Sequence, residues 1–222
     1  MRPRPAREPL QPVTGAGRAA HARALVGLTR AFAARGTGPA AMLLPPRPVA
    51  GRRYPDPPLE LFGGLGRAYY HAHAAPGLPA GEHGHFHVFI RSEQSEGHAH
   101  LAALSVDPWG QPLAWVAVNG WVTGGPWLER RDARRILAAL PAPRPPWEAD
   151  PAAWLEAMVG LHAAALARLL AARDARLARL AAGAGLKLAA ARTARRWYVL
   201  ARRRVRLLEA VARALGGAPL RP

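Results

Sequence analysis

Between residues 67 and 119, apolar and polar side chains alternate with a period of two, which is the pattern of half-buried β-strands. Four segments carry this pattern, at about 67–74, 83–91, 98–106 and 112–119. The connections between them are short and rich in turn-forming residues, so each consecutive pair of strands is expected to form a hairpin. The pattern therefore predicts a four-stranded antiparallel meander sheet over about 67–119.

Helical periodicity is found on both sides of this region. The expected helices lie at about 16–35, at about 129–140, from Pro151 to about Gly183, and at about 187–215. Asp150 is a favoured helix cap, and a proline favours the first helical position that follows it. The proline- and glycine-rich stretch 37–66 is expected to be an extended connector with no long element. The fold class is α+β, with the sheet packed by N- and C-terminal helices.

The length of 222 residues fits one domain with a sizeable core. We expect a disordered basic N-terminus over 1–15, a single α+β domain over 16–182 and a basic helical tail over 183–222. The sequence has no uncharged apolar run of about 18 residues and no signal peptide pattern. It therefore predicts no transmembrane segment and a cytoplasmic location.

The histidines are concentrated in the predicted sheet, where seven of the nine lie between residues 71 and 100. Within each strand they are in phase, so they are predicted to share one face. They are His71, His73, His83, His85, His87, His98 and His100. The opposite face is apolar and is expected to form the core beneath the helices.

The register of the first hairpin decides which histidines meet. A connection over 75–82 places His71 opposite His85 and His73 opposite His83, with facing Cβ atoms about 5 Å apart. The tight cluster is then His71, His73, His83, His85 and His87. The hairpin over 92–97 instead places His98 and His100 about 20 Å of strand away from His85, so these two are weaker candidates. The expected wall of the cluster is Tyr69, Leu104 and Trp115.

A histidine cluster of this density suits a transition metal ion. Imidazoles this close cannot all be charged, and the neutral form binds Zn, Fe, Ni or Cu. The chain has no cysteine, so carboxylates are the other available ligands, and the candidates are Glu82, Glu93, Glu96 and Asp107. The most compact set joins His85 to His71 and to either His83 or His87. Two alternatives remain open, a metal-free pocket for a small ligand and a structural or solvated face.

The net charge of +17 raises a different hypothesis. The excess lies at the two ends of the chain, whereas residues 61–160 are close to neutral. The Arg-rich C-terminal helices would then bind nucleic acid or an anionic surface through Arg195, Arg196, Arg202, Arg203, Arg204 and Arg206. Only one of the 31 basic residues is lysine, however, which is typical of a coding sequence rich in G and C.

Three segments resemble a known protein family. They are 68–73 (Ala-Tyr-Tyr-His-Ala-His), 82–89 (Glu-His-Gly-His-Phe-His-Val-Phe) and 117–124 (Ala-Val-Asn-Gly-Trp-Val-Thr-Gly). Together with the preceding Tyr54-Pro55, they are similar to an uncharacterised proteobacterial family known only as a domain of unknown function. The resemblance covers roughly residues 54–180. It supports these domain limits and implies no activity.

Overall fold

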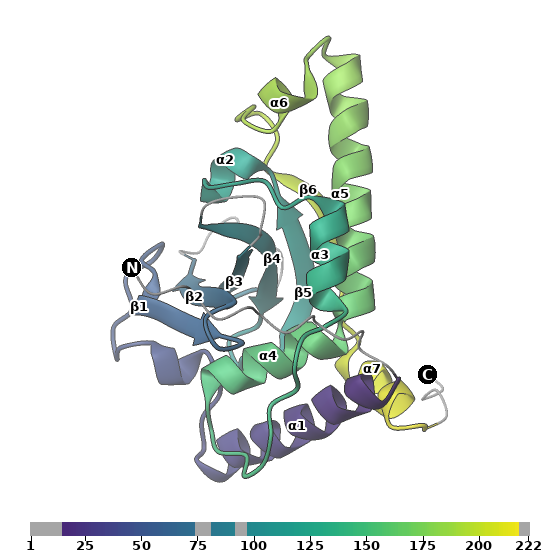
Figure 1. Ribbon diagram of the computed structural model, residues 1–222. Helices are drawn as coiled ribbons and strands as arrows, with labels where there is room; N and C mark the ends of the chain where they lie inside the picture. The colour runs from purple at the N-terminus through teal and green to yellow at the C-terminus, as the bar shows by residue number, and fades with distance from the viewer. Residues whose placement is uncertain (1–14, 74–80, 92–96, 218–222) are drawn as a thin grey trace, which may run out of the picture.

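The protein is built around one six-stranded antiparallel sheet, shown in the computed structural model in Figure 1. The structure describes residues 15–73, 81–91 and 97–217. The strands are β1 (Tyr54–Leu61), β2 (Gly66–Ala72), β3 (Gly84–Arg91), β4 (His98–Val106), β5 (Pro112–Val118) and β6 (Val199–Arg204). Their order in the sheet is their order in the sequence, so the four expected strands, β2 to β5, form the expected meander.

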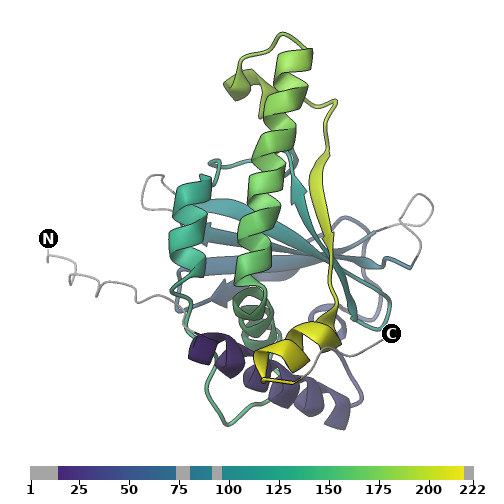
Figure 2. The same cartoon turned by 90° about the vertical axis from the view of Figure 1, so that its right-hand side faces the viewer.

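Helices cover one face of this sheet, which faces the viewer in Figure 2. The helices are α1 (Gly15–Ala34), α2 (Gly120–Thr123), α3 (Arg130–Leu137), α4 (Pro151–Leu161), α5 (Ala163–Gly183), α6 (Leu188–Ala191) and α7 (Leu207–Ala214), with a short 3-10 turn at Ala41–Leu43. The core lies between sheet and helices, where Phe86 and Leu101 are fully buried together with Leu25 and Met158. The α+β class is therefore confirmed.

The expected connector over 37–66 contains the edge strand β1, so the prediction of four strands was wrong at this end. β1 pairs with β2 through an irregular register between Tyr54 and Leu59. Its prolines are atypical of a strand, because proline has no backbone N–H to donate to a neighbouring strand, and so the sequence pattern did not predict it. An edge strand tolerates them because one of its sides has no partner strand.

The expected helix over 187–215 was also wrong, and with it the prediction of an entirely helical tail over 183–222. The segment contains α6, the edge strand β6 and α7, and β6 pairs antiparallel with β5. Arginines make up half of β6, and charged side chains are common on edge strands, where they prevent further pairing. The tail thus contributes a strand to the sheet.

The long helix expected from Pro151 is divided at His162. Asp150 caps α4 as predicted, since its side chain accepts a hydrogen bond from the Ala152 amide at 2.8 Å. Among the described residues no single helix is long and apolar enough to cross a membrane, and the pair α4 and α5, which passes this test together, is bent by 72°.

A β-bulge in β4 changes which of its side chains face the histidines. Val88 pairs with Ala102, but the next residue, Phe89, pairs with His100, so Leu101 is the extra residue. From Ala102 onward the two faces of β4 are exchanged relative to the expected alternation.

Three predictions concern residues that lie mostly outside the described parts of the chain. They are the N-terminal disorder over 1–15, the turn at 75–82 and the turn at 92–97.

Candidate metal centre

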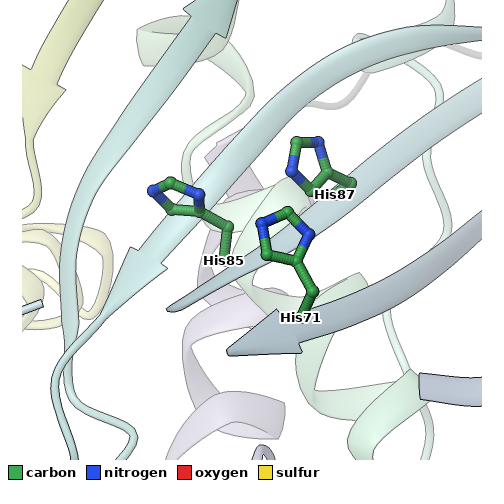
Figure 3. Close-up of side chains that lie close together, drawn as sticks. All are labelled: His71, His85 and His87. Carbon is green, nitrogen blue, oxygen red and sulfur yellow. The ribbon is translucent and has the colours of Figure 1, made fainter. Parts of the chain in front are cut away.

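Three histidines from two neighbouring strands converge on the face of the sheet opposite the helices (Figure 3). His71 on β2 pairs directly with His85 on β3, as the hairpin register predicted, and His87 lies two residues along. One ring nitrogen from each of the three lies within 4.8 Å of the others. Figure 3 shows one nitrogen of His85 on the side of the other two rings and the other nitrogen pointing away.

A second group overlaps the first through His85. It consists of His73, Glu82 and His85, again with ligand atoms within 4.8 Å of one another. His85 Nε2 lies 2.7 Å from Glu82 Oε1, and His73 Nδ1 lies 3.5 Å from the same oxygen. The other nitrogen of His73, Nε2, is 2.8 Å from His71 Nε2, so His73 joins the two groups.

Glu82 is the buried carboxylate at the centre of this network, with a side chain that is 2% exposed. Its Oε2 atom accepts a hydrogen bond from the hydroxyl of Ser105 on β4. The same oxygen accepts one from Arg202 Nη2 on β6 at 3.3 Å. Four side chains from different elements therefore contact one carboxylate, and β6 closes this end of the histidine cluster.

His100 extends the cluster on the side away from Glu82. The bulge leaves it beside Phe89, and its Nε2 atom lies 3.1 Å from His87 Nδ1. Tyr69 stacks on the His87 ring, with centroids 5.2 Å apart. His87 therefore has a hydrogen-bond partner at Nδ1 and an aromatic neighbour on its ring.

Burial keeps these imidazoles neutral. It is the main cause that lowers the pKa of His71 and of His85 to about 4, and neighbouring histidines contribute to both values, whereas Glu82 opposes the shift at His85. Burial also lowers the pKa of His100 to about 3 and that of His87 well below its ordinary value. The pKa of His73 is lowered by burial against the opposing effect of Glu82. At neutral pH the cluster therefore offers free nitrogen lone pairs.

Two of the predicted histidines are separate from the cluster. His83 precedes β3, and its Nδ1 atom lies 2.6 Å from the hydroxyl of Tyr70, which belongs to the core face. His98 lies at the far end of β4, where burial and the charges of Arg67 and Arg91 lower its pKa. Neither belongs to a group of potential metal ligands among the described residues.

The expected wall of Leu104 and Trp115 was wrong, and Tyr69 alone of the three contacts the cluster. Leu104 and Trp115 are fully buried in the core beneath the helices, and the Trp115 ring lies 6.1 Å from that of His162. The bulge in β4 is the physical reason, because it exchanges the two faces beyond Leu101. Ala103 and Ser105 take the places on the histidine face.

A protein family model matches residues 19–205, a range that contains the whole sheet and the histidine cluster. The chain belongs to DUF6969, a domain of unknown function. No curated protein and no solved structure matches it. The DUF6969 match runs from α1 through β6, beyond the expected limit near residue 180, and so includes Glu82, Arg202 and every histidine of the cluster.

The arginines proposed for nucleic acid do not form one helical face. Arg195 and Arg196 lie between α6 and β6, and they stack on Trp121 and Trp197. The other four are in or next to β6, and these are Arg202, Arg203, Arg204 and Arg206. Arg202 contacts Glu82, and Arg206 pairs with Glu209 at 3.1 Å. Binding of a polyanion at these residues stays a prediction.

Sequence reasoning missed the roles of Ser105 and Arg202 at the site. Strict alternation, which ignores the bulge, places Ser105 on the apolar face of the sheet, and the predicted helix over 187–215 contains Arg202. One signal was present in the sequence. Leu101 to Leu104 are all apolar, so alternation is lost where the bulge occurs. Of the candidate carboxylates, Glu82 lies in the cluster, whereas Glu93 and Glu96 are outside the described residues and Asp107 closes the turn before β5.

Proposed function

We propose that this protein binds one transition metal ion through His71, His85 and His87. The observation that carries the proposal is the convergence of their three ring nitrogens to within 4.8 Å. Two nitrogens on one tetrahedral ion lie about 3.4 Å apart, because each metal–nitrogen bond is about 2.0–2.1 Å. Ligand atoms that lie within 4.8 Å of one another are close to this separation, and rotation of the rings would complete the approach.

The protonation state of the cluster favours a cation. A histidine must be neutral to bind a metal, and a proton that has to leave weakens the binding. Burial lowers the pKa of both His71 and His85 to about 4, so no proton has to leave them at pH 7. Both histidines are therefore already neutral in the folded protein before an ion binds.

Glu82 orients His85 rather than acting as a ligand. An ionised carboxylate only accepts hydrogen bonds, so His85 Nε2 carries the proton that Glu82 Oε1 accepts at 2.7 Å. This leaves the lone pair of His85 on Nδ1, the nitrogen on the side of His71 and His87. Carboxylates that hold a ligand histidine in this way are a regular feature of metal sites.

The ligand chemistry narrows the choice of metal to Zn, Ni, Cu or Fe. Neutral imidazoles suit these ions, whereas Mg and Ca prefer oxygen ligands. Three protein nitrogens leave a coordination position for a small ligand, which is the arrangement of catalytic zinc sites. An ion bound there would supply Lewis-acid chemistry to a substrate oxygen. His73 Nε2 lies 2.8 Å from His71 Nε2, so His73 is a direct neighbour of this proposed ligand.

Calorimetric titration of chelator-treated protein with Zn²⁺, Ni²⁺ and Cu²⁺ tests the proposal. We expect one equivalent to bind, and we expect the Kd to rise at least about 100-fold in each of His71→Ala, His85→Ala and His87→Ala. His98→Ala is the matched control, because His98 lies outside the cluster, and it should bind as the wild type does. Circular dichroism confirms that each variant is folded. Equal Kd values for wild type and for folded His85→Ala would contradict the proposal.

A further inference from the structure

A cavity of about 660 Å³ lies on the helical side of the protein, and none of its lining residues belongs to the histidine cluster. Its walls come from α3, from the end of α4, from the first part of α5 and from the start of α1, which lie close together in Figure 2. The volume is within the range of about 300–1,000 Å³ that is usual for small-molecule sites.

Four arginines from three helices line this cavity. They are Arg18 of α1, Arg130 and Arg134 of α3, and Arg168 of α5. Arg130 and Arg134 are one helical turn apart, so both side chains can reach the same ligand. Arg18 is also close enough to the buried ring of His162 to lower its pKa, although burial is the larger cause. The cavity therefore concentrates positive charge from separate parts of the sequence.

Among the described residues this charge has no counterpart in the cavity. No lining residue is acidic, and in the described part of the chain no ion pair joins these four arginines to a carboxylate. The adjoining cavity between α3 and α5 does contain carboxylates, on Glu129 and Asp174. Those two are engaged elsewhere, with Arg192 at 3.0 Å and Arg173 at 2.7 Å.

The remainder of the lining is aliphatic. Leu137 and Leu161 are buried residues of the wall, and small side chains, among them Ala164 and Ala167 of α5, cover the rest. None of the described residues of the lining has an aromatic side chain on which a nucleobase could stack. A ligand that fits this surface carries an aliphatic body as well as a negative charge.

We propose that this cavity binds an aliphatic anion whose carboxylate or phosphate head group is held by the arginines. Guanidinium groups bind both head groups through paired, charge-assisted hydrogen bonds. The aliphatic chain lies against Leu137, Leu161 and the alanines of α5, where its burial adds to the affinity. The site is independent of the proposed metal centre, which lies on the other face of the sheet.

Calorimetry on the full chain with three monomeric probes of equal chain length tests this proposal. We expect dodecanoate and dodecyl phosphate to bind with one site, and the preferred one identifies the head group. Dodecyltrimethylammonium has the same chain with a positive head, so it should not bind. Equal binding of the cationic probe, or no binding of either anion, would overturn the proposal.

Matched variants place the ligand in the cavity. Arg134→Ala should weaken dodecanoate binding about tenfold through the loss of a charge-assisted hydrogen bond. Arg131→Ala removes the same charge from the same helix, but Arg131 lines only the adjoining cavity, so its effect should stay below about twofold. Ala164→Phe places a ring in the cavity from an exposed position and should abolish binding without unfolding the protein.

Two macromolecular alternatives give different results. If the protein binds vesicles that contain phosphatidylglycerol but does not bind monomeric dodecanoate, the proposed cavity site is wrong and the arginines bind a membrane surface instead. Binding of a single-stranded oligonucleotide with a loss that is equal in Arg131→Ala and Arg134→Ala, again without dodecanoate binding, would overturn it in favour of a general polyanion surface. Weaker anion binding in Arg134→Ala alone supports the proposal.

Discussion

His85 Nε2 lies 2.7 Å from Glu82 Oε1, so the carboxylate fixes the tautomer of the histidine that both groups of potential ligands share. The carboxylate is itself fixed by the Ser105 hydroxyl and by Arg202 Nη2. β3, β4 and β6 therefore contribute to the orientation of one imidazole. In the proposed metal centre, this relationship gives Glu82 a positioning role and His85 the role of ligand.

Replacing Glu82 by glutamine should weaken metal binding about tenfold, the low end of the range for residues that orient a ligand. The glutamine keeps the shape but loses the charge that holds the proton on His85 Nε2. Glu148→Gln, at an exposed carboxylate, should leave the Kd unchanged in the same titration. A loss as large as that in His85→Ala would contradict the positioning role and make Glu82 a ligand.

The chelator-treated protein should lose stability as the pH falls from about 6.5 toward 4. Burial lowers the folded-state pKa of His71 and His85 to about 4 and that of His100 to about 3, whereas an unfolded histidine titrates near 6.5. The unfolded state therefore takes up more protons in this interval, and unfolding becomes easier as the pH falls. Calorimetric melting temperatures at pH 7.5, 6 and 5 measure the trend.

In the variant His100→Gln, the melting temperature should fall less steeply with falling pH, because one buried imidazole that resists protonation has been removed. The comparison is made at equal ionic strength, so that general screening of the basic chain is constant. A melting temperature of the chelated wild type that is the same at pH 7.5 and pH 5 would contradict the burial of neutral histidines.

Gly84→Ala should destabilise the hairpin of β2 and β3 by about 1–3 kcal/mol, the usual cost of overpacking. A Cβ atom at Gly84 would meet the backbone oxygen of His71 and the Tyr70 hydroxyl. Gly183→Ala is the control, since a Cβ there meets nothing within 4 Å. Urea unfolding of the two variants measures the difference, and equal midpoints would mean that β2 and β3 do not pair in this register.

Arg173→Leu should cost about 2–4 kcal/mol of unfolding free energy, because it leaves a buried carbonyl unpaired. Arg173 is 3% exposed, donates to the Leu128 carbonyl oxygen at 2.7 Å and lies 3.9 Å from the centroid of the Trp127 ring. Arg176→Leu, at an exposed position of the same helix, should change the stability by less than about 0.5 kcal/mol. Similar losses in both variants would show that the effect is one of helix charge.

The part of the site on β2 and β3 could be predicted from the sequence. A side chain on a strand alternates between faces without exception unless a bulge intervenes, and the short hairpin left His71 opposite His85. The alternation of His85 and His87 with Phe86 and Val88 then separated the cluster from the core. Here local pattern and tertiary structure agree.

The rest of the site depends on features that local pattern does not contain. The bulge occurs where Leu101 to Leu104 are apolar on both faces, so the loss of alternation does not show which residue is the extra one, and strict alternation places Ser105 on the wrong face. β1 and β6 are edge strands, and their prolines and arginines are compatible with an unpaired side rather than with a typical strand sequence. Arg202 reaches Glu82 across 120 residues of sequence, a contact that only the packed sheet creates.

The most direct test of the metal centre is elemental analysis by mass spectrometry of untagged protein purified without chelator, beside His85→Ala. We predict about one equivalent of Zn, Ni, Cu or Fe in the wild type and none in the variant, because His85 belongs to both groups of potential ligands. Wild-type protein that contains no metal and takes up none of these four ions when they are added would contradict the account.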